Sequence, residues 1–181
     1  MCQLLGVSSS SSAWLALRWT EFMARGSASG GNPDGWGVAA QLDDDVSLVR
    51  EPEPAASSEA VRFLESNGPP SRLIVSHIRR ATQGARSLAN TQPFVRRLWG
   101  RAHVFAHNGS VDLPDPGSAE AWTRPIGQTD SERAFCVLLS RLAPLWRSGS
   151  TPPLDERVAV VDALAAELRG RGAVNFLYWD G

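Results

Sequence analysis

Short apolar runs alternate along the chain with polar connections rich in glycine and proline, and this pattern predicts both strands and helices. The predicted strands are Gln3–Val7, Trp36–Gln41, Val46–Arg50, Leu73–His77, Ala102–Ala106 and Val174–Trp179. The predicted helices are Ala13–Ala24, Glu59–Ser66, Ser131–Leu142 and Asp155–Arg169. Strands come before, between and after the helices without strict alternation, so we expect an α+β domain of layered, largely antiparallel sheets.

Polar residues between these segments predict caps and turns. The run Ser8–Ser12 ends in a serine that can cap the first helix. The Asp43-Asp44-Asp45 tip predicts a hairpin between the second and third strands. Residues 112–128 read as a loop. Asp180-Gly181 is a hairpin dipeptide that directly follows a predicted strand, so we expect a single domain, 1–181, that lacks its last strands.

Composition excludes several classes of protein. With 181 residues, 43% of them hydrophobic and 20% charged, the chain is long enough for one domain with its own core. A net charge of −1 and no basic stripe argue against a nucleic-acid partner. No apolar run is long enough to span a membrane and no secretory signal is visible, so we expect a cytoplasmic protein.

Cysteine and histidine usage narrows the chemistry further. The two cysteines, Cys2 and Cys136, do not form a disulfide framework. They and the three histidines lack metal-ligand spacing, and no glycine-rich segment matches a nucleotide-binding fingerprint. We therefore expect no metal and no cofactor.

Cys2 directly follows the initiator methionine. Removal of Met1 would leave a thiol and a free α-amine on one residue, with pKa values of about 8.5 and about 8 in unperturbed groups. Such a pair can exchange a proton near neutral pH, as an amine-activated nucleophile requires. The alternative interpretation is a small residue that begins a strand.

Three polar groups lie at the predicted ends of strands and helices. Arg79 follows an apolar strand and can bind a carboxylate, or it pairs with a surface acid. The Asn108 amide and the Gly109 N–H can stabilise an oxyanion, or they form an ordinary turn. Asp130 can pair with a substrate ammonium, or it belongs to a helix cap with Thr129.

Taken together, the motifs resemble the glutaminase domain of class II glutamine amidotransferases, which are N-terminal nucleophile (Ntn) hydrolases. The resemblance is closest to small stand-alone bacterial members and covers residues 1–181. The motifs that carry it are Met1-Cys2-Gln3-Leu4-Leu5-Gly6, Asp34-Gly35-Trp36-Gly37, His77-Ile78-Arg79, Asn90-Thr91-Gln92-Pro93-Phe94, Leu98-Trp99-Gly100-Arg101, Ala106-His107-Asn108-Gly109 and Thr129-Asp130-Ser131-Glu132. The family fold is an αββα sandwich.

The resemblance implies a catalytic set. Cys2 would be the nucleophile, and its own α-amine would be the base. The Asn108 side chain and the Gly109 backbone would form the oxyanion hole. Attack on the glutamine side-chain amide would release ammonia and leave a γ-glutamyl thioester for water to cleave.

The resemblance also implies a binding set. Arg79 would hold the α-carboxylate of glutamine, Asp130 its α-ammonium, and Thr82 would contribute from the loop that covers the substrate. Two residues of that loop depart from the family pattern: Arg80 stands where an aromatic residue is common, and Gln83 where a histidine is common.

Three functions agree with this set. The first is a glutaminase that passes ammonia to an acceptor on a synthase partner. The second is a γ-glutamyl amide or peptide hydrolase with the same mechanism. The third is a truncated, inactive domain that binds glutamine or a protein partner. Outside the site, we expect Trp36, Trp99 and Trp146 in the core, a buried Cys136, and a structural hydrogen bond at His107.

Overall fold

Seven strands and four helices make up the part of the chain that the structure, a computed structural model, describes: residues 1–13, 16–114, 123–147 and 149–181. The strands are β1 (Gln3–Ala13), β2 (Trp36–Leu42), β3 (Asp45–Glu51), β4 (Ser71–Ile78), β5 (Phe94–Leu98), β6 (Arg101–Val111) and β7 (Gly172–Trp179). The helices are α1 (Ala16–Met23), α2 (Glu59–Asn67), α3 (Asp130–Trp146) and α4 (Leu154–Arg169), with short 3-10 turns at Ala55–Ser57 and Leu88–Asn90.

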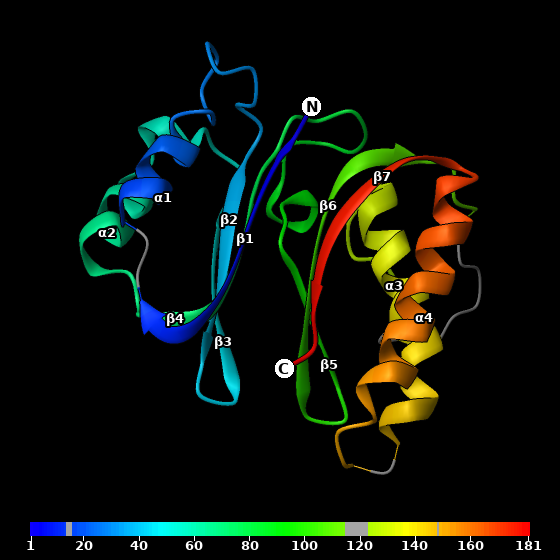
Figure 1. Ribbon diagram of the computed structural model, residues 1–181. Coiled ribbons are helices and arrows are strands. Elements are labelled where there is room, and N and C mark those ends of the chain that lie inside the picture. Colours follow the sequence, from blue (N-terminus) through cyan, green and yellow to red (C-terminus); the bar gives the residue numbers. More distant parts are fainter. Residues whose placement is uncertain (14–15, 115–122, 148) are drawn as a thin grey trace.

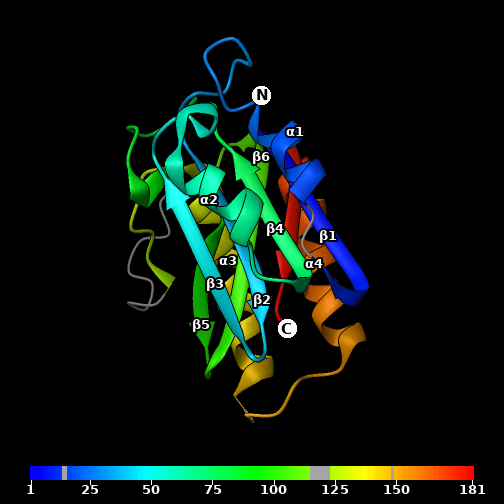
Figure 2. The same ribbon diagram turned by 90° about the vertical axis from the view of Figure 1, so that its left-hand side faces the viewer.

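The strands form two sheets that face each other. One has the order β1-β4-β2-β3 and the other β5-β6-β7, and every pairing is antiparallel. Helices α1 and α2 cover the outer face of the first sheet, and α3 and α4 cover the outer face of the second (Figure 1). Figure 2 shows α1 and α2 lying across the strands of the first sheet. The predicted α+β fold, an αββα sandwich of antiparallel sheets, is confirmed.

Side-chain alternation along the strands divides the core into three layers. Ile74 and Ile78 of β4 face the layer under α1 and α2. Val75 of the same strand joins Val104 of β6 in the layer between the sheets. The third layer, between the second sheet and α3 and α4, contains Phe105 and two leucine-rich helix faces. The same alternation decides which strand residues can reach the space between the sheets.

The serine run is strand, which corrects the predicted helix start. β1 extends to Ala13, with Ser8 opposite Leu73 of β4 and an irregularity before Ala13 meets Ser71. Pairing with β4 at Ser8 and again at Ala13 keeps the chain between them extended, so tertiary contacts override the capping tendency of serine. The helix begins at Ala16, and residues 14 and 15 of the predicted helix lie outside the described residues.

β5, which the sequence analysis missed, pairs with β6 from Phe94 opposite Phe105 to Leu98 opposite Arg101. Its hairpin tip also corrects the prediction for Trp99, which has a positive φ of 50° and is 61% exposed. A tip residue has no second sheet to cover it. Trp36 and Trp146 are buried, as predicted.

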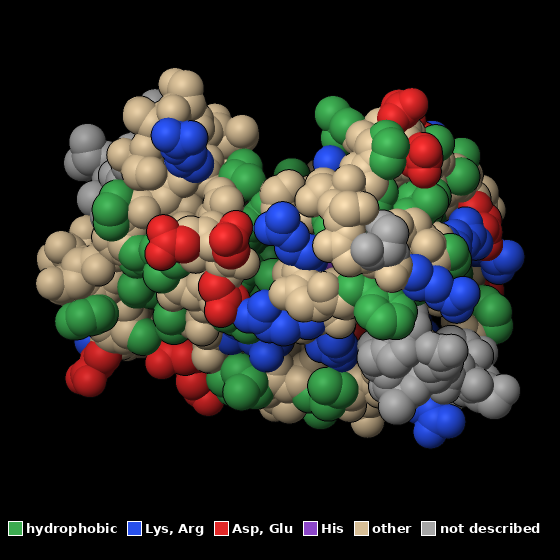
Figure 3. Space-filling model, turned by 90° about the horizontal axis from the view of Figure 1, so that it is seen from below, with side chains coloured by type: hydrophobic (Ala, Val, Ile, Leu, Met, Phe, Trp, Pro, Cys, Tyr) green, Lys and Arg blue, Asp and Glu red, His purple; other side chains and the backbone are tan. Residues whose placement is uncertain are grey.

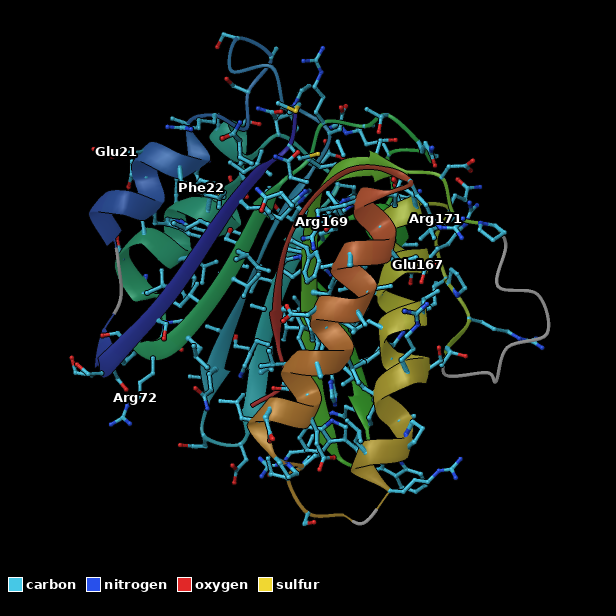
Figure 4. All side chains as sticks on the ribbon, turned by 45° about the vertical axis from the view of Figure 1, so that its right-hand side comes forward. Glu21, Phe22, Arg72, Glu167, Arg169 and Arg171 are labelled. Carbon is cyan, nitrogen blue, oxygen red and sulfur yellow. The ribbon has the colours of Figure 1, made fainter. Side chains whose placement is uncertain are left out.

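Charged side chains hold the periphery together. At the lower end of the sandwich, Arg97 pairs with Asp45 and Arg101 with Asp44, which joins the β5–β6 tip to the β2–β3 tip. Viewed from below, arginine and acidic side chains lie next to one another there (Figure 3). At the end of α4, Glu167 bonds Arg141 of α3 at 2.5 Å and Arg171 at 3.4 Å, and Figure 4 shows Glu167 close to Arg171.

Among the described residues, none of the helices combines the length and the apolar character that a membrane span requires.

Candidate active site

Cys2 lies immediately before β1 and is bonded to the backbone of Arg80, two residues after the end of β4. The Arg80 N–H donates to the Cys2 Sγ at 3.2 Å, and the thiol donates to the Arg80 carbonyl oxygen at 3.3 Å. Burial raises the pKa of the thiol, while the Arg80 N–H, the terminal ammonium and the Arg79 charge act in the opposite direction. The sulfur is thus oriented by main-chain atoms, and burial outweighs the nearby positive groups, so the pKa of the thiol stays above its ordinary value.

Strand register brings Cys2 next to Arg79. Gln3 lies opposite Ile78 in the antiparallel β1–β4 pair, so the residue before Gln3 meets the residue after Ile78. Cys2 shares its face of the sheet with Leu4, which packs in the layer between the sheets. The two residues that the sequence assigned to nucleophile and carboxylate binding are therefore neighbours at one end of the sandwich.

The guanidinium of Arg79 is buried and surrounded by carbonyl oxygens. Its Nη2 donates to Gln83 at 2.9 Å and Gly84 at 3.0 Å, and its Nη1 to Ala85 at 3.3 Å and Asp34 at 3.5 Å. Burial lowers the pKa of Arg79, and the charges of Asp34 and Cys2 oppose that shift. Arg79 thus fastens the loop that follows it onto the site.

Asp34, from the Asp34-Gly35-Trp36-Gly37 motif, supports the same loop, a role that the sequence analysis missed. Its Oδ2 accepts from the Ala81 N–H at 2.8 Å, and its backbone N–H donates to the Arg79 carbonyl at 3.1 Å. Thr82, two residues further from the strand than Arg80, is exposed in this loop. Thr82 therefore lies over the Cys2–Arg79 end of the molecule and outside its buried part.

Asn108 and Gly109 do not end a strand, as the sequence predicted, but lie inside β6, which continues to Val111. Pairing with Asn175 and Val174 of β7 carries the strand past them, and a long-range partner of this kind leaves no local signal. Asn108 lies on the same face of β6 as Val104 and Ala106, which face the first sheet. Its amide is therefore directed between the sheets, as the side chain of Cys2 is.

Only glycine fits at position 109. A Cβ there would lie 1.9 Å from the Ala173 carbonyl oxygen and 2.7 Å from the His107 Nε2. β7 and the His107 ring therefore approach the Gly109 backbone closely. The backbone N–H that the sequence analysis assigned to the oxyanion hole belongs to a rigid, tightly packed segment.

Asp130 begins α3 and is buried, and it contacts β6 directly. Thr129 caps the helix, because its Oγ1 accepts from the Glu132 N–H at 3.2 Å, so the cap belongs to Thr129. Asp130 Oδ2 accepts from the Val111 N–H at 2.8 Å. The same carboxylate opposes the lowering of the His107 pKa that burial causes. Asp130 is thus tied to the segment of β6 that carries Asn108 and Gly109.

Two histidines lie near this segment of β6. His107 belongs to β6 itself, and His77 belongs to β4 of the first sheet. The His107 Nδ1 is 2.9 Å from the Ser131 Oγ, which confirms the predicted structural hydrogen bond. His77 faces the space between the sheets, and neither of its ring nitrogens has a hydrogen-bond partner among the residues that the structure describes. Burial, followed by the charges of His107 and Arg79, lowers the pKa of His77 to about 3, so its ring is neutral at pH 7.

The second thiol differs from the first. Cys136 is 1% exposed within α3, as predicted, and burial together with Glu132 raises its pKa to about 11. Cys2 is partly exposed and is therefore the more accessible of the two thiols.

Within the described residues, no three His, Cys, Asp or Glu side chains are grouped so that they could hold a metal ion.

Comparison with known proteins decides the family. A family model described as class II glutamine amidotransferases matches residues 1–181. The chain belongs to that family. Glutamine amidotransferases act on glutamine, so family membership assigns this general chemistry to the chain.

Curated relatives match over the whole chain and are themselves longer. YafJ of Escherichia coli (strain K12) is 37% identical over 184 residues, covering 100% of this chain and 70% of YafJ. The uncharacterized protein MJ1515 of Methanocaldococcus jannaschii is 33% identical, covering 100% of this chain and 49% of that relative. The chain thus spans between about half and about two thirds of the length of these relatives.

Solved structures support the same fold. A crystal structure of a predicted glutamine amidotransferase from Pseudomonas aeruginosa PA01 is 33% identical, with a TM-score of 0.67 over 99% of this chain and 70% of that one. Glutamine phosphoribosylpyrophosphate amidotransferase from B. subtilis is 16% identical, with a TM-score of 0.62 over 99% of this chain and 35% of that one. The second likeness concerns the fold, which is of the Ntn type.

Proposed function

We propose that residues 1–181 form a glutaminase domain that hydrolyses the side-chain amide of glutamine through Cys2 and releases ammonia. The observation that carries this proposal is the position of Cys2. Its sulfur is bonded to the Arg80 backbone next to the buried Arg79 guanidinium. Asn108 shares the face of β6 that meets the first sheet, and Asp130 accepts from the Val111 N–H at the end of the same strand.

The proposed reaction begins after Met1 is removed. The Cys2 α-amine takes the thiol proton, and the sulfur attacks the amide carbon. The Asn108 amide and the Gly109 N–H donate to the oxyanion that forms. The ammonium then returns its proton to the leaving nitrogen, ammonia departs, and a γ-glutamyl thioester remains. Water, deprotonated by the same amine, cleaves the thioester and yields glutamate and free Cys2.

Head-group recognition would use opposite charges at two places. Arg79 would bind the α-carboxylate, which replaces some of the carbonyl oxygens of residues 83–85 around the guanidinium. Asp130 would bind the α-ammonium with the carboxylate that also accepts from Val111. Thr82 would contact the substrate when its loop closes. Binding is thus coupled to the order of the loop that Arg79 fastens.

Labelling with 6-diazo-5-oxonorleucine, a glutamine-like electrophile, tests this function. We expect one adduct per chain at Cys2, lost in Cys2→Ala and kept in Cys136→Ala, together with ammonia release from glutamine. Mass spectrometry of the intact chain first establishes that Met1 is absent. No adduct on processed, folded protein would refute the catalytic role and favour a domain that binds without turnover.

The γ-glutamyl hydrolase is the second candidate, because Arg79 and Asp130 would recognise the glutamyl head of either substrate. Comparing kcat/KM for glutamine with kcat/KM for γ-glutamyl dipeptides separates the two. A preference for dipeptides would favour a γ-glutamyl hydrolase that transfers no ammonia to an acceptor. A preference for glutamine supports ammonia transfer to an acceptor site on a synthase partner in the cytoplasm.

A further inference from the structure

The segment Asn90–Pro93 was part of the sequence resemblance, but the proposed mechanism gives it no role. It follows the short turn Leu88–Asn90 and leads into β5. Asn90, Thr91 and Gln92 are polar, yet each is at most 4% exposed. Buried polar side chains are normally hydrogen-bonded, so the partners of these residues show what the segment does.

Gln92 bonds both backbone groups of His107. Its Oε1 accepts from the His107 N–H at 2.6 Å, and its Nε2 donates to the His107 carbonyl at 3.2 Å. The regular β5–β6 pairing ends at Phe94 opposite Phe105, two residues earlier along β6. The Gln92 amide thus takes the place of a strand peptide group beside the residue that precedes Asn108.

Other elements fix the same stretch of β6 from different sides. β7 pairs with it from His107 to Val111. Ser131 bonds the His107 ring, and Asp130 bonds the Val111 N–H. Gln92 supplies the constraint on the β5 side, where β5 no longer pairs with β6. Asn108 and Gly109 are consequently held by contacts on both edges of their strand.

Asn90 links the two binding residues instead. Its Nδ2 donates to the Ala85 carbonyl at 2.8 Å, the same oxygen that accepts from Arg79. Its Oδ1 accepts from the Gln128 N–H at 2.7 Å, two residues before Asp130. One buried side chain therefore joins the loop around Arg79 to the segment that leads into α3.

We propose that Gln92 is a positioning residue for the oxyanion pair and that Asn90 is a positioning residue for the head-group pair. The inference rests on the proposed function. Gln92 acts through His107 on Asn108 and Gly109, so it affects the transition state more than the bound substrate. Asn90 acts through Ala85 and Gln128 on Arg79 and Asp130, so it affects substrate binding. Neighbouring residues thus serve different steps.

Substitutions with opposite kinetic signatures test this division. Gln92→Met keeps the volume and removes both hydrogen bonds. We expect kcat to fall by about 10- to 100-fold with KM within about twofold. This is less than the ~100- to 1000-fold loss from removing an oxyanion donor itself, because Gln92 acts through His107. Asn90→Leu should raise KM by about tenfold and change kcat little. Ser76→Ala is the matched control, because it removes a buried side-chain bond to the Gly37 carbonyl at 2.7 Å. The Ser76 side chain lies on the same face of β4 as Ile74 and Ile78, which is the face away from β6. A kinetic profile of Gln92→Met equal to that of Ser76→Ala overturns the proposal.

Gln92→Glu gives a second readout that a purely structural role would not move. A protonated carboxyl can accept from the His107 N–H and donate to its carbonyl, whereas a carboxylate can only accept. The ratio of kcat in Gln92→Glu to kcat in the unaltered chain should therefore rise as pH falls from 8 to 6. A ratio that does not change with pH argues against a positioning role for Gln92. This test still applies if Gln92→Met does not fold.

Failure of the inference differs from failure of the proposed function. If the unaltered chain releases no ammonia and Cys2 takes up no label, the proposed function is wrong whatever the variants do. Amide hydrogen exchange of the peptide containing residues 105–111 then judges the positioning alone. Faster exchange in Gln92→Met than in Ser76→Ala supports it, and equal exchange contradicts it.

Discussion

The two ends of the sandwich are held together by different forces. At the Cys2 end, buried side chains bond backbone atoms of other elements, as Arg79, Asn90 and Gln92 do. At the opposite end, the hairpin tips are joined by exposed ion pairs such as Arg97–Asp45. Buried bonds to backbone groups leave an unsatisfied partner when they are broken, whereas exposed ion pairs are replaced by water at little cost. We therefore expect function and stability to be sensitive at the first end and tolerant at the second.

The largest effect should come from the nucleophile. Cys2→Ala should reduce ammonia release from glutamine to the background rate, because no other described thiol adjoins Arg79. Its circular dichroism spectrum should stay unchanged and its melting temperature should fall by no more than about 2 °C, since the two bonds between Cys2 and the Arg80 backbone are exposed and water can replace them. Activity retained in Cys2→Ala would contradict the proposal that the Cys2 end of the sandwich is the catalytic site.

Gly109→Ala should disturb the fold as well as the chemistry. The added methyl group would collide with the Ala173 carbonyl, so β6 and β7 must separate. We expect a loss of about 1–3 kcal/mol in the free energy of unfolding, as for other overpacked core sites. Urea denaturation measures it. Gly170→Ala is the control, because Gly170 has a negative φ of −75° and the nearest atom would lie 3.3 Å from the added carbon. Equal losses in the two variants would contradict the claim that β6 and β7 leave no room at Gly109.

Acid should lower the free energy of unfolding, because His77 at the Cys2 end is held neutral in the folded state. Its folded pKa of about 3 lies below the ordinary value of 6.5, so the unfolded state binds the extra proton first as pH falls. Stability is thus complete above about pH 6.5 and declines by at most about 1.4 kcal/mol per pH unit for this group below that value. His77→Leu should give a flatter dependence of unfolding free energy on pH between 6.5 and 5. A slope identical to that of the unaltered chain would show that other groups dominate.

The smallest effects belong to the lower end. Trp99→Ser removes an exposed side chain, and Arg97→Ala breaks an exposed ion pair. Each should change the melting temperature by no more than about 2 °C and leave kcat/KM for glutamine unaltered. Differential scanning calorimetry and the ammonia assay check both. A loss of several degrees would mean that this end contributes more than its contacts indicate.

Sequence reasoning succeeded where local patterns and packing agree. The β2–β3 hairpin, α2, α3 and α4 follow from apolar periodicity, turn residues and caps, and the structure places them within a few residues of the prediction. It failed where a distant partner decides. Ser8–Ser12 is strand because β1 pairs with β4 at Ser8 and again at Ala13, and β5 exists because β6 offers an edge. Trp99 is exposed because the hairpin tip projects beyond the second sheet.

For the candidate site, the sequence could supply residue types but not their supports. Cys2 and Arg79 were recognisable from their positions, and register makes them neighbours. The roles of Gln92 and Asn90 depend on bonds to residues 15 and 38 positions away. No local pattern encodes such separations, although the quoted motif already contained both residues. The assignments of Cys2, Asn108, Gly109, Arg79, Asp130 and Thr82 stay predictions that the labelling and kinetic experiments test.

The close approach of Ala173 to Gly109 has a mechanical consequence. With no room for even one methyl group between them, the two strands can only move as a unit at this point. A force or a partner that displaces β7 would therefore also displace Gly109 in the neighbouring strand, which is part of the proposed oxyanion hole. Turnover would then respond to events on the outside of the molecule without any change in the residues that contact glutamine.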